Sequence, residues 1–128
     1  MKPLLSSSPL DAKTRFRVQI KHAVAIGPGK ADVLQAIAET GSIAEAGRRL
    51  GMSYQRVWSL VRAMNGDFVE PLVLTQRGGT AGGGAGLTDT GQQVLTVYRA
   101  IERDAERAMA KRLPQLLALI RPEVGAAP

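Results

Sequence analysis

The chain has 128 residues, which is enough for one domain with its own core and too few for two substantial domains. Its composition, with 45% hydrophobic and 22% charged residues, excludes an intrinsically disordered chain. Its lack of cysteine excludes disulfides and thiolate metal sites, and its net charge of +6 favours polyanionic partners through counterion release.

Two further features of the sequence exclude whole classes of protein. No apolar run approaches the roughly 20 residues that span a bilayer, and the N-terminus lacks the apolar segment of a signal peptide. We therefore expect a soluble, cytoplasmic protein with no membrane partner. His22 is the only histidine, so we expect no metal site, no cofactor and no histidine-based nucleophile.

The first part of the chain predicts a flexible arm and two short strands. Residues 1–14 are rich in serine and show no periodicity, which is typical of a mobile arm. Residues 15–21 alternate apolar and polar side chains, as in a half-buried strand, and Ala23–Ile26 is a second apolar run. The two strands either close into a hairpin or, if they are too short for that, pair across a dimer. Next, one apolar face over Lys30–Thr40 predicts a helix that ends at Gly41.

The centre of the sequence predicts two helices joined by a tight turn. Ser42 and Glu45 have the spacing of a capping box, in which the hydroxyl accepts from the Glu45 N–H and the carboxylate reaches back to the Ser42 N–H. The helix that they begin ends at Gly51, where we expect a left-handed residue. Ser53 is the predicted N-cap of the next helix, which runs to about Asn65. Such a pair is a helix-turn-helix, whose second helix enters the major groove of DNA.

The second of these helices has an apolar face and a polar face without acids. Donors and cations of this kind suit base edges and phosphates. Arg56 either contacts guanine or phosphate or simply solvates the helix, and its place near the helix N-terminus favours the contact. Trp58 follows a core position, so we expect it to pack at the domain edge. The candidate DNA-binding residues of this helix are Ser53, Tyr54, Gln55, Arg56, Ser59 and Arg62.

Three more arginines are candidate DNA-binding residues through phosphate contacts. Arg48 and Arg49 end the preceding helix, where a cation is also favoured by the helix dipole, so both interpretations stay open. Arg77 opens a glycine-rich loop, where phosphate contact and plain solvent exposure both stay open.

A wing is predicted after the second helix. Leu72–Leu74 is a β-type run, residues 76–86 hold six of the fourteen glycines, and ordered chain resumes at Leu87-Thr88. The glycine cluster contains neither the G-x-G-x-x-G nor the G-x-x-x-x-G-K-[S/T] pattern, so it is not a nucleotide-binding loop. We expect its glycines to let the backbone approach the minor groove or phosphates.

A long final helix is predicted to begin with Asp89 and Gln92 as its caps and to be ended or kinked by Pro114. Its charged residues would form a solvated outer face. Residues 113–128 would then be a short amphipathic segment and a disordered tail, which leaves 15–112 for the main domain. A heptad-like seam for dimerisation is formed by Val94, Tyr98, Ile101, Ala105 and Ala108.

Several short sequence motifs, given at the end of this paragraph, together resemble those of a known family over roughly residues 15–110. Their order and spacing are similar to the winged-helix N-terminal domain of ModE-type, molybdate-responsive transcriptional regulators. The helix-turn-helix alone is also similar to LysR-type regulators. The motifs are Gly41-Ser42-Ile43, Ser53-Tyr54, Trp58, Met64-Asn65, the glycine clusters at 78–79 and 82–84, and Leu87-Thr88 with Gly91.

The resemblance implies a mainly α fold with a small β content. That fold is a winged helix-turn-helix with an N-terminal β-hairpin, a glycine-rich wing and a long C-terminal dimerisation helix. It further implies that the second helix binds DNA, that the wing contacts the backbone, and that the strands and the final helix form a dimer. ModE-type regulators sense oxyanion through a separate C-terminal domain, which is not found after the long helix here, so we do not expect molybdate binding to carry over.

From these observations we expect a sequence-specific transcriptional regulator that binds double-stranded DNA as a homodimer. Twofold symmetry predicts a pseudo-palindromic operator, and the resemblance links it to molybdate or metal-transport genes. The alternative is a winged-helix module that binds another protein and no DNA. We do not expect an enzyme, because no nucleophile, metal or phosphate constellation occurs in the sequence.

Overall fold

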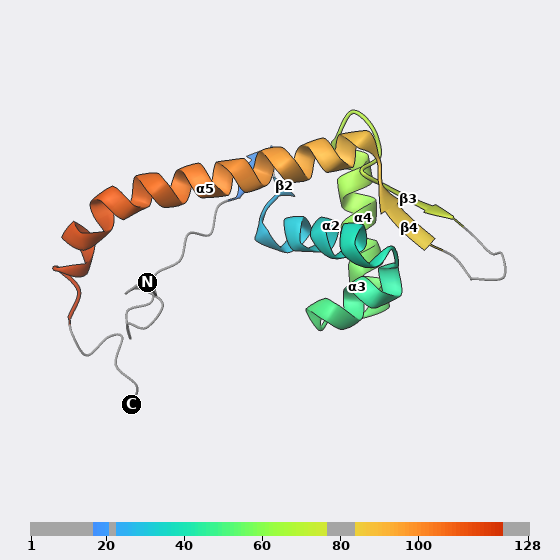
Figure 1. Ribbon diagram of the computed structural model, residues 1–128, viewed down its shortest axis with the longest axis horizontal. Coiled ribbons are helices and arrows are strands. Elements are labelled where there is room, and N and C mark those ends of the chain that lie inside the picture. Colours follow the sequence, from blue (N-terminus) through green and yellow to red (C-terminus); the bar gives the residue numbers. More distant parts are fainter. Residues whose placement is uncertain (1–16, 21–22, 77–83, 122–128) are drawn as a thin grey trace. The chain divides into compact units, whose positions relative to one another are not determined.

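The computed structural model describes residues 17–20, 23–76 and 84–121 (Figure 1). The chain divides into two compact units, of which one is Phe16–Ala100 and the other has 101–121 as its described residues. The predicted arm, His22, Arg77 with most of the glycine-rich loop, and the predicted tail lie outside the described residues. Within those ranges, no helix is both long enough and apolar enough to cross a membrane.

The two N-terminal strands pair with each other within the chain. β1 (Val18–Ile20) is antiparallel to β2 (Ala23–Ile26), with one irregularity in register between Val18 and Gln19. Of the two interpretations open from the sequence, the hairpin is the one observed. Ile26 at the end of β2 is buried in the core of the first unit.

Three helices follow the hairpin. α2 (Pro28–Thr40) begins two residues before the predicted start, because proline at the first helical position lacks only an N–H that the helix would leave unpaired. It ends at Gly41, which is left-handed with φ 72° and donates its N–H to the Ile37 carbonyl at 2.8 Å. The predicted stop at Gly41 is therefore confirmed.

The predicted capping box of α3 (Ile43–Leu50) is half formed. The Ser42 hydroxyl accepts from the Glu45 N–H at 3.1 Å, as predicted. The reciprocal bond is absent among the described contacts, because the Ser42 N–H donates to the Thr40 hydroxyl at 3.3 Å and the Glu45 carboxylate pairs with Arg48 instead. The prediction was thus wrong for the carboxylate.

The turn between α3 and α4 (Tyr54–Asp67) depends on two glycines. Gly51 is left-handed with φ 67°, as predicted. A Cβ at Gly47 would lie 2.8 Å from the Met52 carbonyl oxygen, so the turn can fold tightly against α3 only if residue 47 has no side chain. α4 continues two residues past the predicted end at Asn65.

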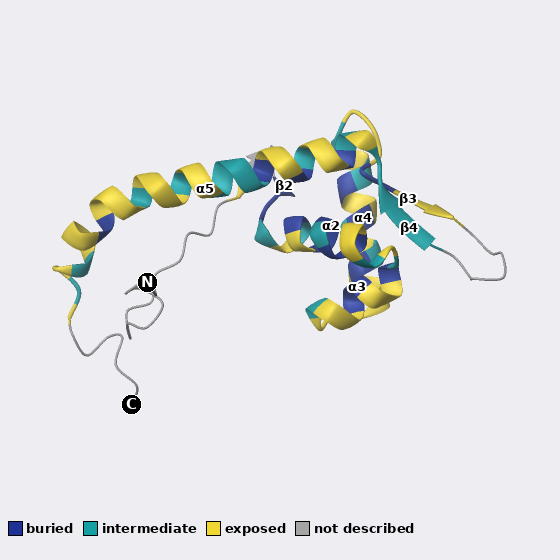
Figure 2. Ribbon diagram, in the orientation of Figure 1, coloured by how far each residue is buried: buried dark blue, intermediate teal, exposed yellow. Residues whose placement is uncertain are grey.

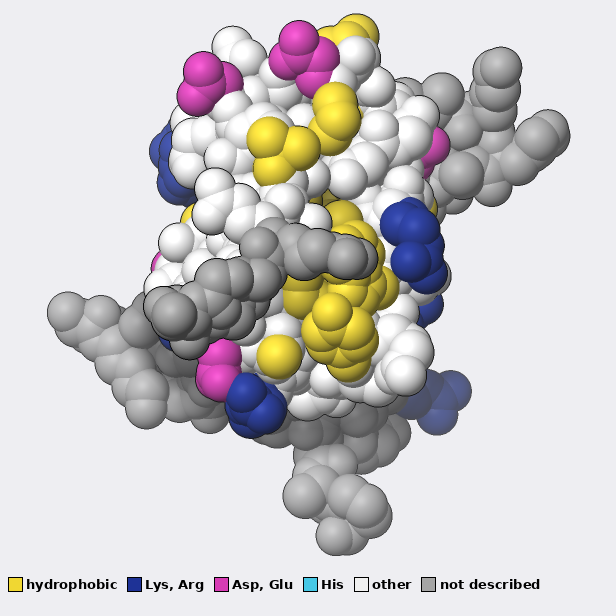
Figure 3. Space-filling view, turned by 90° about the vertical axis from the view of Figure 1, so that its right-hand side faces the viewer, with side chains coloured by type: hydrophobic (Ala, Val, Ile, Leu, Met, Phe, Trp, Pro, Cys, Tyr) yellow, Lys and Arg dark blue, Asp and Glu magenta, His cyan; other side chains and the backbone are white. Residues whose placement is uncertain are grey.

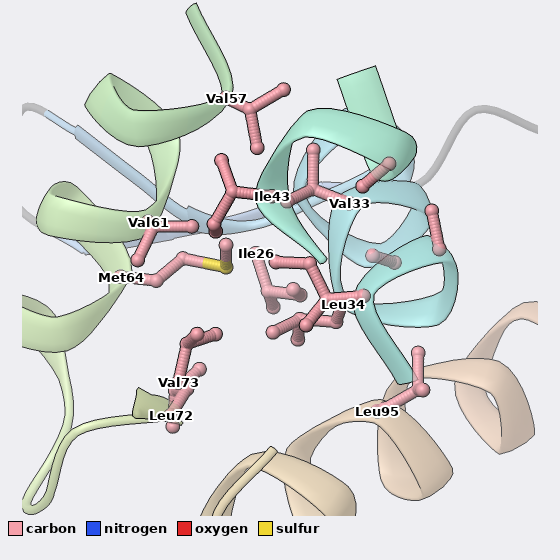
Figure 4. Packing of buried hydrophobic residues seen from close by; sticks show 14 of the residues in the cluster. Ile26, Val33, Leu34, Ile43, Val57, Val61, Met64, Leu72, Val73 and Leu95 are labelled. Atoms are coloured by element: carbon pink, nitrogen blue, oxygen red, sulfur yellow. The ribbon is translucent and has the colours of Figure 1, made fainter. Parts of the chain in front are cut away.

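The core of the first unit lies between the three helices (Figure 4). Val57, Val61 and Met64 of α4 are fully buried and face Leu34 of α2 and Ile43 of α3. Side chains of this kind contribute roughly 1.5 to 3 kcal/mol each when they are removed from water. The core therefore fixes which face of α4 points inward.

The predicted wing is formed by two antiparallel strands, β3 (Val73–Gln76) and β4 (Gly84–Leu87), with Val73 opposite Leu87. Here "the wing" means residues 73–87. Ala85 at its base donates its N–H to the Gly41 carbonyl at 2.9 Å, so β4 is hydrogen-bonded to the turn between α2 and α3.

The last helix, α5 (Asp89–Leu117), is capped by a residue other than those predicted. The Thr88 hydroxyl accepts from the Gly91 N–H at 2.9 Å and donates to the Pro71 carbonyl at 2.7 Å. Thr88 therefore takes the place predicted for Asp89 and Gln92. α5 also continues through Pro114 to Leu117, so the proline does not end it.

The first turns of α5 pack into the core of the first unit. Leu95 is 4% exposed and Tyr98 is 1% exposed, and both belong to the core cluster. Tyr98 was predicted to lie in a seam open to a second chain, and this was wrong because its own chain buries it. Farther along, Ile101 and Ala105 are half-buried and Ala108 is exposed.

Candidate nucleic-acid interface

The residues of the polar face predicted on α4 are exposed, and Figure 2 shows buried and exposed stretches in turn along this helix. We call this polar face the recognition face. It lies opposite Val57, Val61 and Met64, each of which is completely buried. The core thus holds the donors and cations outward. The recognition face consists of Ser53, Tyr54, Gln55, Arg56, Ser59 and Arg62, and every one of these residues is exposed.

The start of α4 is fixed by a side-chain cap. The Ser53 hydroxyl accepts from the Arg56 N–H at 3.0 Å, which satisfies one of the unpaired donors of the first turn. This cap sets Arg56 in the first turn of the helix. Among the described residues, none forms an ion pair or a hydrogen bond with its guanidinium, so no acid neutralises its charge. It is therefore available to an external acceptor.

An aromatic pair and a cation lie side by side on the same helix. The rings of Tyr54 and Trp58 meet edge to face, with centroids 6.4 Å apart and planes at 70°. The Arg62 guanidinium lies 5.8 Å from the centre of the Trp58 ring, within cation–π range. Trp58 is half-buried against the core, as the sequence predicts. Together with Gln55, these three residues line an open hollow of about 290 Å³, which we call the aromatic hollow.

The two arginines at the end of α3 are exposed but paired with acids. Arg48 forms an ion pair with Glu45 in its own helix, and Arg49 forms one with Glu39 of α2. The hydrogen bond from Arg48 lowers the pKa of Glu45, and bonds from Gln35 and then Arg49 lower the pKa of Glu39. Exposed pairs of this kind are weak, so phosphate can compete for either arginine.

A second hollow lies at the base of the wing. It has a volume of about 330 Å³ and is lined by Gly41 and by residues of both wing strands. The end of the molecule that carries these strands is seen in Figure 3, where hydrophobic side chains gather in the middle of the face and Lys and Arg side chains lie beside them. Leu74 of β3 is 60% exposed.

Asn65 is a positioning residue that the sequence did not reveal. Its side-chain oxygen accepts from the N–H groups of Leu72 at 2.8 Å and Val73 at 3.1 Å, and its amide donates to the Val73 carbonyl at 3.1 Å. The end of α4 is therefore joined directly to the start of the wing. In the sequence, Asn65-Gly66-Asp67 indicated only a helix end, and nothing in it identifies a partner seven or eight residues away.

These elements define a class of domain, the winged helix-turn-helix. A solved structure titled as the crystal structure of the CbnR DBD–DNA complex matches the chain with a TM-score of 0.55 and 25% identity, covering 69% of this chain and 95% of that one. Residues 30–92 match the family described as bacterial regulatory helix-turn-helix protein, lysR family. The mainly α winged fold predicted from the sequence is thereby confirmed.

The curated relatives with similar sequences include proteins named for molybdenum binding and transport. The chain is 40% identical over 85 residues to the molybdenum-pterin-binding protein MopB of Rhodobacter capsulatus, covering 66% of this chain and 32% of MopB. It is 35% identical over 100 residues to the molybdenum transport protein ModE of Azotobacter vinelandii, covering 75% of this chain and 37% of that protein. The chain is 33% identical over 91 residues to the transcriptional regulator ModE of Haemophilus influenzae, covering 71% of this chain and 36% of that protein.

The chain thus matches the lysR-type helix-turn-helix model over residues 30–92 and is similar to the ModE and Mop proteins, as the resemblance in its sequence predicts. It spans about a third of the length of the curated relatives that it matches.

Proposed function

We propose that this chain is a sequence-specific DNA-binding transcriptional regulator. The observation that carries the proposal is the recognition face, an exposed and acid-free helix surface held outward by a fully buried opposite face. An α-helix with such a surface fits the major groove, where donors and cations meet base edges and phosphates. The names of the relatives, which include a DNA complex and transcriptional regulators, support the same function.

In this proposal the recognition face enters the major groove. Arg56 and Gln55 contact bases, and Ser53 and Ser59 contact bases or phosphates near them. Arg48 and Arg49 leave their acidic partners to contact phosphate, which costs little because the pairs are exposed. Arg77 contacts the DNA backbone from the loop of the wing. These contacts together would fix the register of the domain on DNA.

We further propose that two chains bind a pseudo-palindromic operator as a homodimer. The flanking hairpin and α5 supply the dimer contacts, and half-sites are separated by about one helical turn of DNA or a multiple of it. In terms of organisation, we propose an arm over 1–14, the DNA-binding domain with its long helix over 15–112, and a terminal segment over 113–128.

The proposal also includes the genes that the protein regulates. Because its relatives are named for molybdenum binding and transport, we propose that its targets include molybdate or metal-transport genes. Its place of action is the cytoplasm, where the DNA is, and it has no catalytic role. We assign no oxyanion site to the described residues.

Selection of fragments from genomic DNA by the purified chain tests the proposal. We expect a set of fragments that share a pseudo-palindromic sequence. The logarithm of the binding constant should fall steeply and linearly with the logarithm of the salt concentration. The alternative is a winged module that binds another protein, for which exposed Leu116 and Leu119 provide apolar surface. Absence of measurable DNA binding at low salt would favour this alternative.

A further inference from the structure

Two aromatic rings in contact with each other, those of Tyr54 and Trp58, form the walls of the aromatic hollow. Trp58 packs against the core of the first unit, so its ring is fixed. Tyr54, one helical turn earlier, is 52% exposed and meets the Trp58 ring edge-on. A large aromatic side chain with this exposure leaves apolar surface open to water at the N-terminal end of α4. A ligand that covered this surface would bind more tightly, because removing apolar surface from water is favourable.

The surface that lines the hollow is mostly apolar, and none of its four residues is an acid. Gln55 and Arg62 complete the lining, with the Arg62 guanidinium held near the Trp58 ring. An occupant should therefore be apolar where it meets the rings, and acceptors beside its apolar part would meet the N–H donors of Gln55 and Arg62. Apolar surface and acceptors must lie only a few ångströms apart in that occupant.

Among the base pairs of DNA, those with thymine have this combination in the major groove. Thymine presents a C5-methyl group beside its O4 acceptor, and no other standard base presents an apolar group there. We propose that the aromatic hollow recognises a thymine methyl group, with Tyr54 and Trp58 contacting the methyl and Gln55 donating to the base edge. This assignment rests on the proposed function, because it requires α4 to lie in the major groove.

Replacement of thymine by deoxyuridine tests this assignment, because it removes the methyl group and leaves the pairing unchanged. The full chain is titrated against its selected operator and against duplexes in which each thymine in turn is deoxyuridine. We expect one position in each half-site to lose affinity roughly fourfold, which is the effect of ~0.8 kcal/mol for one buried methyl group. We expect the remaining positions to bind as the native operator does.

Variants of Tyr54 then connect the effect to the hollow. Tyr54→Ala leaves only the Trp58 ring and should lose most of the preference for thymine, whereas Tyr54→Phe keeps both rings and should retain it. Val69→Ala is the control, because Val69 is 94% exposed in the bend after α4, and it should discriminate as the native chain does.

Each contrary outcome has a distinct meaning. Tight, selective binding with no methyl-dependent position would overturn the assignment of the hollow and leave the proposed function standing. A methyl-dependent position whose effect is undiminished in Tyr54→Ala would place the methyl contact elsewhere and would also overturn the assignment. If neither operator nor random duplex bound at low salt, the proposed function itself would fail together with this inference.

Discussion

The role of each residue in α4 is set by its angle around the helix axis. With 3.6 residues per turn, Val57, Val61 and Met64 share one side, and the structure buries all three completely. Arg56 lies next to Val57 in sequence, yet its side chain points to water. Its guanidinium lacks an acidic partner among the described residues, whereas Arg48 is already paired with Glu45. An external acceptor can therefore bind Arg56 without displacing an acid, whereas Arg48 must first leave Glu45.

The variant Arg56→Ala should weaken binding to the selected operator by about 1 to 3 kcal/mol and relax specificity at one base pair, because a positioned guanidinium would lose its contact with a base edge. Titration by fluorescence anisotropy measures both. Arg103→Ala is the matched control, since it removes an exposed arginine from α5 and changes the net charge equally. Equal affinities of the native chain and Arg56→Ala for operator and for random duplex would show that Arg56 makes no specific contact.

At the scale of elements, two side chains and one glycine hold the wing and α5 in place. Asn65 joins the end of α4 to β3 through three hydrogen bonds, and Thr88 joins the start of α5 to Pro71. At Gly91, a Cβ would lie 2.1 Å from the Leu72 carbonyl oxygen, so α5 approaches the segment before β3 closely. The wing is therefore held at its base.

Replacement of Asn65 by alanine should lower the free energy of unfolding by about 1 to 3 kcal/mol, because the part-buried N–H groups of Leu72 and Val73 would lose their acceptor. Urea unfolding followed by circular dichroism measures this change. Asn65→Asp keeps an acceptor for both N–H groups and should lose less. If both variants unfolded at the native urea concentration, the side-chain bridge would contribute nothing to stability.

A pair of glycine substitutions tests the close approach of α5. Gly91→Ala should destabilise the fold by about 1 to 3 kcal/mol or more, because its methyl group would meet backbone that cannot move aside cheaply. Gly66→Ala is the matched control in α4, where nothing lies within 4 Å of the added Cβ. It should stabilise by roughly 0.5 to 1 kcal/mol through helix propensity. Thermal unfolding of the two variants gives both values, and equal melting temperatures would contradict the close packing.

At the scale of the whole molecule, the core of the first unit includes part of its own α5, since Leu95 and Tyr98 are buried there. The second unit differs. Its described residues are those of the later part of α5 and the turn after it, where Ile101 and Ala105 are half-buried and, farther along, Leu116 and Leu119 are exposed. A single helix with apolar residues along it gains from a second helix, which supports the proposed homodimer.

A charge placed on the predicted seam of α5 should separate the proposed dimer. We expect the native chain to show a dimeric mass by light scattering at micromolar concentration, and Ala105→Glu to shift it toward the monomer, because a buried unpaired carboxylate is costly. Ala110→Glu lies on another side of the helix, is exposed, and should leave the mass unchanged. A native chain that is monomeric throughout would contradict the homodimer.

The sequence by itself determined the elements whose signals are local. Capping serines, the glycine stops and the apolar periodicity of the central helices depend on residues a few positions apart, so the two helices, their turn and the outward face of α4 were predictable from sequence. The glycine-rich excursion between two β-type runs indicated the wing in the same way. The candidate residues of α4 followed directly from this periodicity.

Only the tertiary structure decided which partner each polar group takes. The Glu45 carboxylate binds Arg48 instead of closing the capping box, Thr88 caps α5 because Pro71 lies beside it, and Asn65 bonds to the wing. Tyr98 fits a heptad seam by its spacing, yet it is buried in its own chain. In each case the choice depends on which competing group the folded chain brings within hydrogen-bonding or packing distance, and spacing along the sequence does not contain that information.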